Sequence, residues 1–333
     1  MKILGMMHQH SGCGYHRVLL PLGFMPGITG YVTNVLTEDK QEGWDIFLFN
    51  RLSCFDHNWT EAKKLIKAKV VMDIDDYWVL PHNHINHIDY EHHKETIENN
   101  LINADMVTVT NQNLYDKVKP FNSNVHIFPN ALPFGKNQFT EERRESDRVR
   151  IFWAGGVTHE HDLKLLQNPF KRLSIFKDKI QMVIGGYNDD NEQSKAIWDR
   201  MLSYFTQGLP YMKLHGTSPT SYMQMYENAD IVVIPLEDTD WHRSKSNLKI
   251  LEAAAKRLPV IVSNVEPYSL DKDAPVLWVN SQKDWFEHLK YLILNPDARV
   301  ELGNKLYEWA KEKYSLETVN ERRFAAFSDL CKA

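Results

Sequence analysis

The sequence predicts an α/β protein built from two doubly wound parallel sheets, one in each of two domains. Short apolar runs rich in Val and Ile alternate with helical stretches along the chain. These runs lack the strict apolar–polar alternation of strands with one face in solvent, so helices are expected to cover both faces of each sheet. The series of runs occurs twice, and 333 residues are enough to bury two separate cores.

The expected strands follow one another at similar intervals in each half. In the first half they are KILGMM (2–7), DIFLFN (45–50), KVVMDID (69–75), MVTVT (106–110) and VHIFP (125–129). In the second half they are RIFWAGG (150–156), QMVIGG (181–186), MKLHG (212–216), DIVVIPL (230–236), PVIVS (259–263) and PVLWVN (275–280). Two such Rossmann-like domains are expected to bind ligands in a cleft between them, at the carboxyl ends of the strands.

The two series are separated by the charged, proline-containing stretch 130–148. We therefore expect an N-terminal domain at 1–135 and a C-terminal domain at 136–312. The tail at 313–333 has apolar residues at helical spacing. It is expected to form a C-terminal helix that returns toward the first domain.

Composition narrows the class of protein. The net charge of −5 is evenly spread, with 16 Lys/Arg and 19 Asp/Glu at 1–150 and 23 and 25 at 151–333. This balance argues against a surface adapted to a nucleic-acid backbone. The N-terminus lacks the apolar stretch of a signal peptide, and no apolar run reaches the length of a membrane span. We expect a cytoplasmic protein with no membrane span, and the sequence indicates no protein partner.

Glycine-containing loops follow the first strand of each half. Gly12 and Gly14 in SGCGYHR (11–17) permit a tight turn in which backbone amides and Arg17 approach a phosphate. A plain strand-to-helix turn is an equal alternative. In the second half, Gly155 and Gly156 end a strand and Thr158 is expected to cap a helix whose free N–H groups favour a diphosphate.

A third candidate site surrounds the start of the predicted helix at 248–257. The polar and cationic residues that cluster there are Arg243, Lys245, Ser246, Asn247 and Lys249. Cations beside a helix N-terminus suit a pyrophosphate. Glu252 lies between Leu251 and three alanines, which disfavours a solvated position. Its carboxylate could accept two hydrogen bonds from the paired hydroxyls of a ribose.

At these residues the sequence resembles the retaining glycosyltransferases of the GT-B fold, family 4 in particular. The segment YENADIVVIPLEDTDWHRSKSNLKILEAAAKRLPVIVSN (226–264) is similar to the family's nucleotide-sugar segment, in which two glutamates lie eight positions apart. Glu252 matches the second glutamate, which the family uses to hold the ribose of the donor. FPNALP (128–133) and IFWAGGVTHEHDLKLL (151–166) resemble the family's exit from the first domain and its phosphate loop.

The sequence departs from the family pattern at three positions. The first glutamate of the pair falls on Ser244, and the basic pair of the phosphate loop falls on Gly156 and His161. We therefore assign the diphosphate to Lys245, Lys249 and Arg243. The missing glutamate leaves the sugar of the donor open, a pentose included.

Two carboxylates after the strand at 69–75 are candidates for catalysis. Asp76 is the best match to the family's short His-Asp element near the reacting sugar, with Asp75 next, and either could act as a base or orient the acceptor. An acidic helix cap is an equal alternative. The histidine-rich stretch 82–93 lacks a clean metal-ligand spacing. We expect it to be a loop near the acceptor entrance, with Tyr90 and Trp78 available for stacking.

The resemblance implies a transferase that moves a sugar from a nucleoside diphosphate, UDP above all, to an acceptor hydroxyl with retention and without a metal or other cofactor. The first domain would take the acceptor, a glycan in the ordinary case. A DNA-modifying, bacteriophage-type enzyme acting on a hydroxymethylated base is an alternative, with local basic side chains from 136–150. A nucleotide-sugar epimerase and a non-catalytic nucleotide-sugar-binding protein are alternatives from other classes.

Overall fold

The computed structural model describes residues 1–7, 11–34, 43–53, 59, 63 and 67–332. The contacts within the chain divide it into two compact units. The first unit consists of Met1–Pro133, Arg243–Ser246 and Tyr314–Ala333, and the second of Phe134–His242 and Asn247–Lys313. The chain therefore passes from one unit to the other four times.

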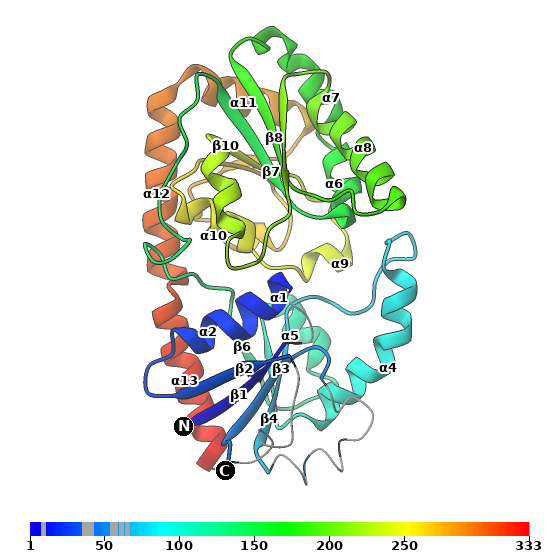
Figure 1. Cartoon of the computed structure of the whole chain (residues 1–333), viewed down its shortest axis with the longest axis vertical. Helices are drawn as coiled ribbons and strands as arrows, with labels where there is room; N and C mark the ends of the chain where they lie inside the picture. Colours follow the sequence, from blue (N-terminus) through cyan, green and yellow to red (C-terminus); the bar gives the residue numbers. More distant parts are fainter. Residues whose placement is uncertain (8–10, 35–42, 54–58, 60–62, 64–66, 333) are drawn as a thin grey trace. The chain divides into compact units, whose positions relative to one another are not determined.

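The first unit contains a parallel six-stranded sheet in the order β2-β1-β3-β4-β5-β6 (Figure 1). Its strands are β1 Lys2–Met6, β2 Thr29–Thr33, β3 Ile46–Asn50, β4 Lys69–Ile74, β5 Met106–Val109 and β6 Val125–Ile127. β3 is buried along its whole length. Its side chains alternate between two clusters, since Phe47 and Phe49 belong to one and Ile46 and Leu48 to the other. Both faces of the sheet are therefore covered.

Helices from both ends of the chain cover these faces. The helical elements of the first unit are α1 Gly12–Gly14, the π-helical turn η1 Tyr15–Leu19, α2 Leu20–Gly23, α4 His87–Asn103, α5 Gln112–Val118 and α13 Leu316–Lys332. Ile97 and Leu101 of α4 pack with Phe47 and Phe49. Phe327 of α13 packs with the opposite face. Residues of the first strand and of α13 thus pack in the same hydrophobic cluster.

The second unit contains another parallel six-stranded sheet, in the order β12-β11-β10-β7-β8-β9. Its strands are β7 Val149–Ala154, β8 Ile180–Tyr187, β9 Tyr211–His215, β10 Ile231–Ile234, β11 Val260–Ser263 and β12 Leu277–Val279. Trp153 at the end of β7 packs with Trp198 in a large buried cluster on one face. The two sheets confirm the predicted α/β fold class.

The helical elements of the second unit are η3 Val157–His159, α6 Glu160–Lys164, α7 Gln167–Lys171, η4 Arg172–Phe176, α8 Glu192–Thr206, η5 Tyr222–Asn228, α9 Asp240–Arg243, α10 Leu248–Ala255, η6 Tyr268–Leu270, α11 Gln282–Leu294 and α12 Pro296–Tyr314. Two of these helices end in the first unit, because Arg243 of α9 and Tyr314 of α12 belong to it. Among the described residues, none of these or of the first unit's helices combines the length and the apolar character that crossing a bilayer requires.

The structure differs from the sequence-based expectations at four places. The edge strand β2 has no counterpart among the predicted strands, because its sequence TGYVT is half exposed and weakly apolar. The expected loop at 82–93 runs into α4, which begins at His87. Trp78, expected to stack on a ligand, is buried and its indole N–H donates to Glu98 at 3.2 Å. The capped helix expected after Gly156 is a 3-10 turn followed by the five-residue α6, and the residue before that turn is Gly156, not Thr158.

Candidate functional site

Glu252 lies in the middle of α10 and is buried, with 4% of its side chain exposed. The helix is otherwise apolar on its buried faces, because Ile250, Leu251 and the following alanines carry no polar side-chain atoms. One carboxylate oxygen, Oε2, accepts a hydrogen bond of 2.7 Å from the hydroxyl of Tyr226. Glu252 is thus a carboxyl group held inside the second unit.

Burial changes the proton affinity of this carboxyl group. Removing the carboxylate from water raises the pKa of Glu252 from its ordinary 4.5 to about 7, against the opposing effects of the Lys249 charge and the Tyr226 hydrogen bond. Carboxyl groups with such values cluster at functional sites, where a charge is kept ready for a ligand.

Lys249 lies one turn before Glu252 on α10 and reaches the end of β7. Its ammonium group donates to the carbonyl of Ala154 at 2.6 Å and lies 5.7 Å from the centre of the Trp153 ring. Gly155 follows directly. The backbone of β8 approaches closely here, since a side chain at Gly186, whose φ is +89°, would lie 2.2 Å from the Gly155 carbonyl oxygen. The Lys249 ammonium group and a backbone segment that accepts only glycine at position 186 therefore lie together at the end of β7.

A group of polar side chains that was not predicted from the sequence follows this loop. Nδ1 of His159 lies 2.7 Å from Asp162, whose other oxygen accepts a 2.8 Å hydrogen bond from the Glu237 amide. His242 contributes a further nitrogen 3.9 Å from the same carboxylate. The histidines and the backbone bond lower the pKa of Asp162 against its burial. The spacing H-x-x-D on one helical turn is the signal that could have indicated this pair.

The predicted pyrophosphate ligands fall into two groups. Asn247, Lys249, Gly155, Gly156 and Thr158 belong to the second unit, as does Glu252. Arg243, Lys245 and Ser246 belong to the first, together with Gly12, Gly14 and Arg17. Asn247 donates to Asp271 at 2.7 Å within the second unit. The backbone and side chains of 243–246 instead accept hydrogen bonds from asparagines of the first unit: Asn113, Asn111 and Asn130.

Asp75 and Asp76 lie directly after β4, and both contact Arg51. Nε and Nη2 of Arg51 donate to Oδ1 of Asp75 at 2.9 and 2.7 Å, and Nη2 lies 3.3 Å from Asp76. Lys245 approaches Asp76 from another segment of the first unit, at 3.7 Å. Asp75 is 11% exposed and Asp76 27%. The two candidate catalytic carboxylates therefore share one guanidinium group.

The guanidinium group determines the charge of Asp75. Burial alone would raise the pKa of Asp75, but Arg51 holds it far below its ordinary value. Arg51 itself has a φ of +60°, a left-handed conformation that costs a non-glycine residue free energy. The sequence around Arg51 does not indicate a site, because its partners come from three distant segments. They are the aspartates directly after β4, the Tyr90 hydroxyl of α4 and Cys13 of the 11–14 turn.

A pocket of about 320 Å³ opens beside this cluster within the first unit. It is lined by Ser11, Cys13, Asn50, Arg51, Leu52, Tyr90, His93 and Ile97. His16, on the adjacent η1, has its pKa lowered to about 4 by burial and by the Arg17 charge, so its imidazole is neutral near pH 7. The pocket is thus lined by apolar as well as polar side chains, and it lies at the carboxyl ends of β1 and β3.

Arg17 does not contribute to this pocket, contrary to its predicted role as a phosphate ligand. Its side chain is 1% exposed, and its guanidinium group donates to both oxygens of Asp73 at 2.9 and 2.8 Å and to Asn130 at 3.1 Å. Gly12 and Gly14 form the short α1, in which the Ser11 hydroxyl accepts from the Gly14 amide. Arg17 is therefore a core ion-pair residue of the first unit.

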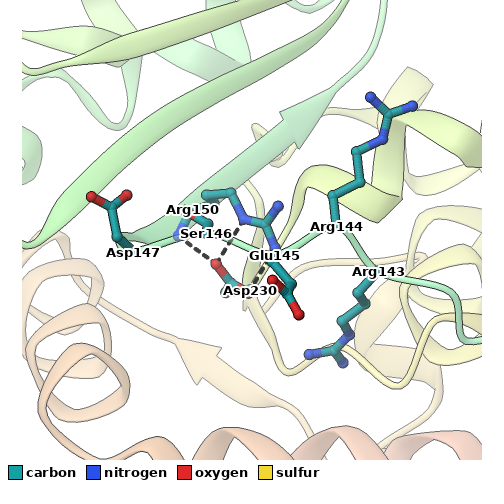
Figure 2. A pocket seen from close by; sticks show the side chains of 7 residues that line it. All are labelled: Arg143, Arg144, Glu145, Ser146, Asp147, Arg150 and Asp230. Atoms are coloured by element: carbon teal, nitrogen blue, oxygen red, sulfur yellow. Dashed lines mark hydrogen bonds and ion pairs between the residues drawn. The ribbon is translucent and has the colours of Figure 1, made fainter.

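Three of the five basic residues of 136–150 line a second pocket, of about 750 Å³ (Figure 2). Three arginines, Arg143, Arg144 and Arg150, line it together with three acids, Glu145, Asp147 and Asp230. Arg150 makes a two-pronged ion pair with Asp230, at 2.9 and 3.1 Å. Arg143 donates to the carbonyl groups of Lys256 and Arg257, just after α10. The lining has no excess of positive charge, so it does not form a basic surface for a nucleic-acid backbone.

Within the described ranges, no three His, Cys, Asp or Glu side chains are grouped as a metal ion would require. In the histidine-rich stretch, His82 contacts His87 at 3.0 Å, and the other nitrogen of His87 contacts the carbonyl of Leu80 at 3.0 Å. These contacts connect the stretch to the start of α4.

Comparison with known proteins identifies the second unit. The family model described as "Glycosyl transferases group 1" matches residues 148–295. This range contains Gly155, Tyr226, Lys249 and Glu252. A comparison with curated protein sequences gave no significant match.

Solved structures resemble the whole chain. Sucrose-phosphate synthase from Thermosynechococcus elongatus is similar with a TM-score of 0.72 at 11% identity, over 99% of each chain. HepE from Anabaena, solved in complex with UDP, gives 0.67 at 9% identity, over 99% of this chain and 100% of that one. A UDP-forming trehalose-phosphate synthase from Burkholderia xenovorans gives 0.61 at 14% identity, over 90% and 75%. The whole chain therefore has the GT-B fold of these structures, and its residues 148–295 match a glycosyl transferases group 1 domain.

Proposed function

We propose that the protein transfers a sugar from a UDP-sugar to an acceptor hydroxyl with retention of anomeric configuration. The second unit binds the donor, and the first unit binds the acceptor. The observation that carries this proposal is the buried carboxyl of Glu252, one helical turn from Lys249, whose ammonium group contacts the carbonyl of Ala154 just before the glycine loop. Two similar structures support UDP as the nucleotide, since one contains UDP and another is of a UDP-forming enzyme.

The donor is held by three kinds of group. The ionised Glu252 accepts hydrogen bonds from the two ribose hydroxyls. Lys249 and the amides of Gly156 and Thr158 contact the diphosphate, while the Gly155 amide donates to the carbonyl of Gly185. Charge builds up on that diphosphate as the sugar departs, so a fixed cation stabilises the transition state more than the ground state. No metal or other cofactor has a role in this scheme.

The acceptor occupies the pocket beside Arg51. Asp75 stays ionised because Arg51 holds its pKa low, so it anchors and orients neighbouring groups and is a poor proton acceptor. Asp76 is more exposed, at 27%. Asp76 therefore accepts or orients the proton of the attacking hydroxyl, and attack on the same face as the departing diphosphate gives retention.

A ligand screen followed by a turnover assay tests the proposal. UDP and UDP-sugars should raise the melting temperature by mass action more than ADP- or GDP-sugars do. Slow release of UDP from one UDP-sugar should occur without acceptor, and Glu252→Gln should lose both effects while Glu287→Gln, on the exposed side of α11, keeps them. Conversion of the free UDP-sugar to another sugar would instead indicate an epimerase, and the absence of any turnover would indicate a binding protein.

The stereochemistry and the acceptor need separate measurements. The anomeric proton of the product, observed by NMR, should keep the configuration of the donor, and an inverted product contradicts the scheme. Transfer to hydroxymethylated DNA, with binding that weakens as salt rises, would assign the acceptor to DNA. Transfer to a glycan with indifference to DNA would assign it to sugars.

A further inference from the structure

We infer that the hydroxyl of Tyr226 positions the Glu252 carboxylate for the donor ribose. Tyr226 does not itself contact the donor in this inference, so it is a positioning residue. The inference rests on the proposed donor role of Glu252. It adds a residue that the family resemblance did not indicate.

The surroundings of Tyr226 fix its hydroxyl in place. Tyr226 belongs to η5 and is 1% exposed. Its ring packs against Phe152 of β7 at 4.7 Å between ring centres and against Tyr222 at 6.0 Å. A buried side chain held between a strand and its own helical turn has little rotational freedom. The 2.7 Å hydrogen bond therefore places Oε2 of Glu252 at a defined point.

Fixing one oxygen fixes the other. A carboxylate that accepts a bond at Oε2 cannot rotate freely about its last torsion, so the direction of Oε1 is determined as well. Two neighbouring ribose hydroxyls require both a defined direction and an ionised acceptor. The Tyr226 hydroxyl contributes to both, because a hydrogen bond donated to the charged form favours that form.

The groups that face Glu252 come from three elements. Lys249 on α10 lowers the pKa of Glu252, as does the hydroxyl of Tyr226 on η5. The pKa of Tyr226 is itself far above its usual range, through burial and the Glu252 charge, so its hydroxyl keeps its proton and remains a donor. Tyr222 on η5 and Tyr268 on η6 also have raised pKa values that include the Glu252 charge as a cause. Of Glu252 and these three tyrosines, Glu252 is the one that titrates near pH 7.

The test is the pH dependence of UDP affinity in Tyr226→Phe. Isothermal titration from two pH units below to two above the Glu252 midpoint near 7 measures it. In the wild-type protein, affinity should fall as pH drops through about 7. In Tyr226→Phe that fall should begin at a higher pH, with affinity at pH 7 roughly tenfold weaker. Raising the pH should restore most of the loss, which a merely structural defect would not allow.

A double-mutant cycle separates this inference from the proposed function. Glu252→Gln should lose affinity at every pH, and adding Tyr226→Phe to it should have little further effect, because both changes remove the same interaction. Tyr307→Phe on α12, a buried tyrosine packed on Phe134, is the matched control and should bind as the wild type does. If Glu252→Gln binds UDP normally, the donor role fails and this inference fails with it.

Two other outcomes overturn the inference while leaving the donor role intact. One is an unshifted pH midpoint in Tyr226→Phe, and the other is a loss of affinity that is equal at all pH values. Should the variant fail to fold, the wild-type protein provides a second measurement. The hydroxyl proton resonance of Tyr226 should shift with pH at the same midpoint as UDP binding, and a resonance that does not follow that midpoint contradicts the inference.

Discussion

Asp75 in the first unit and Glu252 in the second are both removed from water, yet their pKa values shift in opposite directions. Asp75 contacts Arg51 through two N–H groups, which lower its pKa far below the ordinary value. Glu252 has a neutral hydroxyl and a lysine that donates elsewhere, and its pKa rises to about 7. Burial is common to both, so the partner decides the charge.

The difference assigns different tasks to the two carboxyl groups. Asp75 stays ionised, and its buried charge is stabilised by the guanidinium group of Arg51. Glu252 is a carboxyl group whose ionisation can respond to a ligand, since a bound ribose hydroxyl favours the charged form. Substitutions at these carboxyl groups and at their partners test this difference.

The largest effect is expected from Arg51→Ala. This change leaves Asp75 buried without its cation, which typically costs about 3–5 kcal/mol of unfolding free energy. Urea denaturation followed by circular dichroism measures it. Adding Asp75→Asn should recover part of the loss, because it removes the uncompensated charge. A loss below about 1 kcal/mol, as for an exposed pair, would show that Arg51 does not control Asp75.

The pH dependence of stability should differ between wild type and Glu252→Gln. The folded pKa near 7 exceeds the ordinary 4.5, so the native state binds the proton more tightly than the unfolded state. That contribution is complete below about pH 4.5 and is lost as pH rises through 7.

Wild type should therefore lose about 3 kcal/mol relative to Glu252→Gln across this interval. The unfolding free energies of both proteins at the two ends of the interval measure the difference. Glu287→Gln, at a half-exposed position, should track the wild type. A constant difference between wild type and Glu252→Gln would mean that Glu252 has an ordinary pKa.

Lys249→Met should weaken UDP binding by at least tenfold, about 1.4 kcal/mol. The variant loses the phosphate contact that we propose for Lys249, and it loses a charge that lowers the pKa of Glu252. The acid limb of the binding curve should therefore move to higher pH as well. Lys305→Met, which removes an exposed lysine of α12 paired with Glu301, is the control. Calorimetric titration with UDP at several pH values separates the two effects, and an unmoved limb refutes the electrostatic coupling.

Asp76→Asn is expected to have the smallest effect on stability, below about 1 kcal/mol. Asp76 is more than twice as exposed as Asp75, and its contacts with Arg51 and Lys245 are longer, at 3.3 and 3.7 Å. Transfer activity should nevertheless fall sharply, because the acceptor hydroxyl loses its proton acceptor. Denaturation and a turnover assay on the same sample distinguish the two quantities. Full activity in this variant would remove Asp76 from the mechanism.

The fold was largely readable from sequence because buried parallel strands carry a strong local signal. Every strand predicted from an apolar run overlaps a strand of the structure, from β1 to β12. β2 was missed because an edge strand needs only one paired neighbour and keeps exposed, polar positions. α4 was missed for a similar reason, since its buried residues are only Ile97, Asn100 and Leu101 in a helix of 17 residues.

The candidate site was readable only where one segment supplies it. Glu252 stood out because its chain neighbours are apolar, and it is buried as that context indicated. Arg51 and Tyr226 gave no such signal, because their hydrogen-bond partners are distant in the chain. Asp75 and Tyr90 lie 24 and 39 positions from Arg51, and Glu252 lies 26 positions from Tyr226. The predicted phosphate contact of Arg17 failed for the same reason, since Asp73, which pairs with its guanidinium group, lies 56 positions further along the chain.

The chain passes between the two units four times, and this limits which fragments can contain a complete unit. A fragment that ends at Pro133 contains the first six strands but lacks Phe327 and Leu330 of α13, which belong to that unit's core. It also lacks Arg243–Ser246, which lie between the two segments of the second unit in the chain. Neither half can be obtained intact by one cut. The same order applies during synthesis on the ribosome. Val18, Leu22 and Met25 reach this face of the sheet early, but the face is fully covered only after α13 has been made.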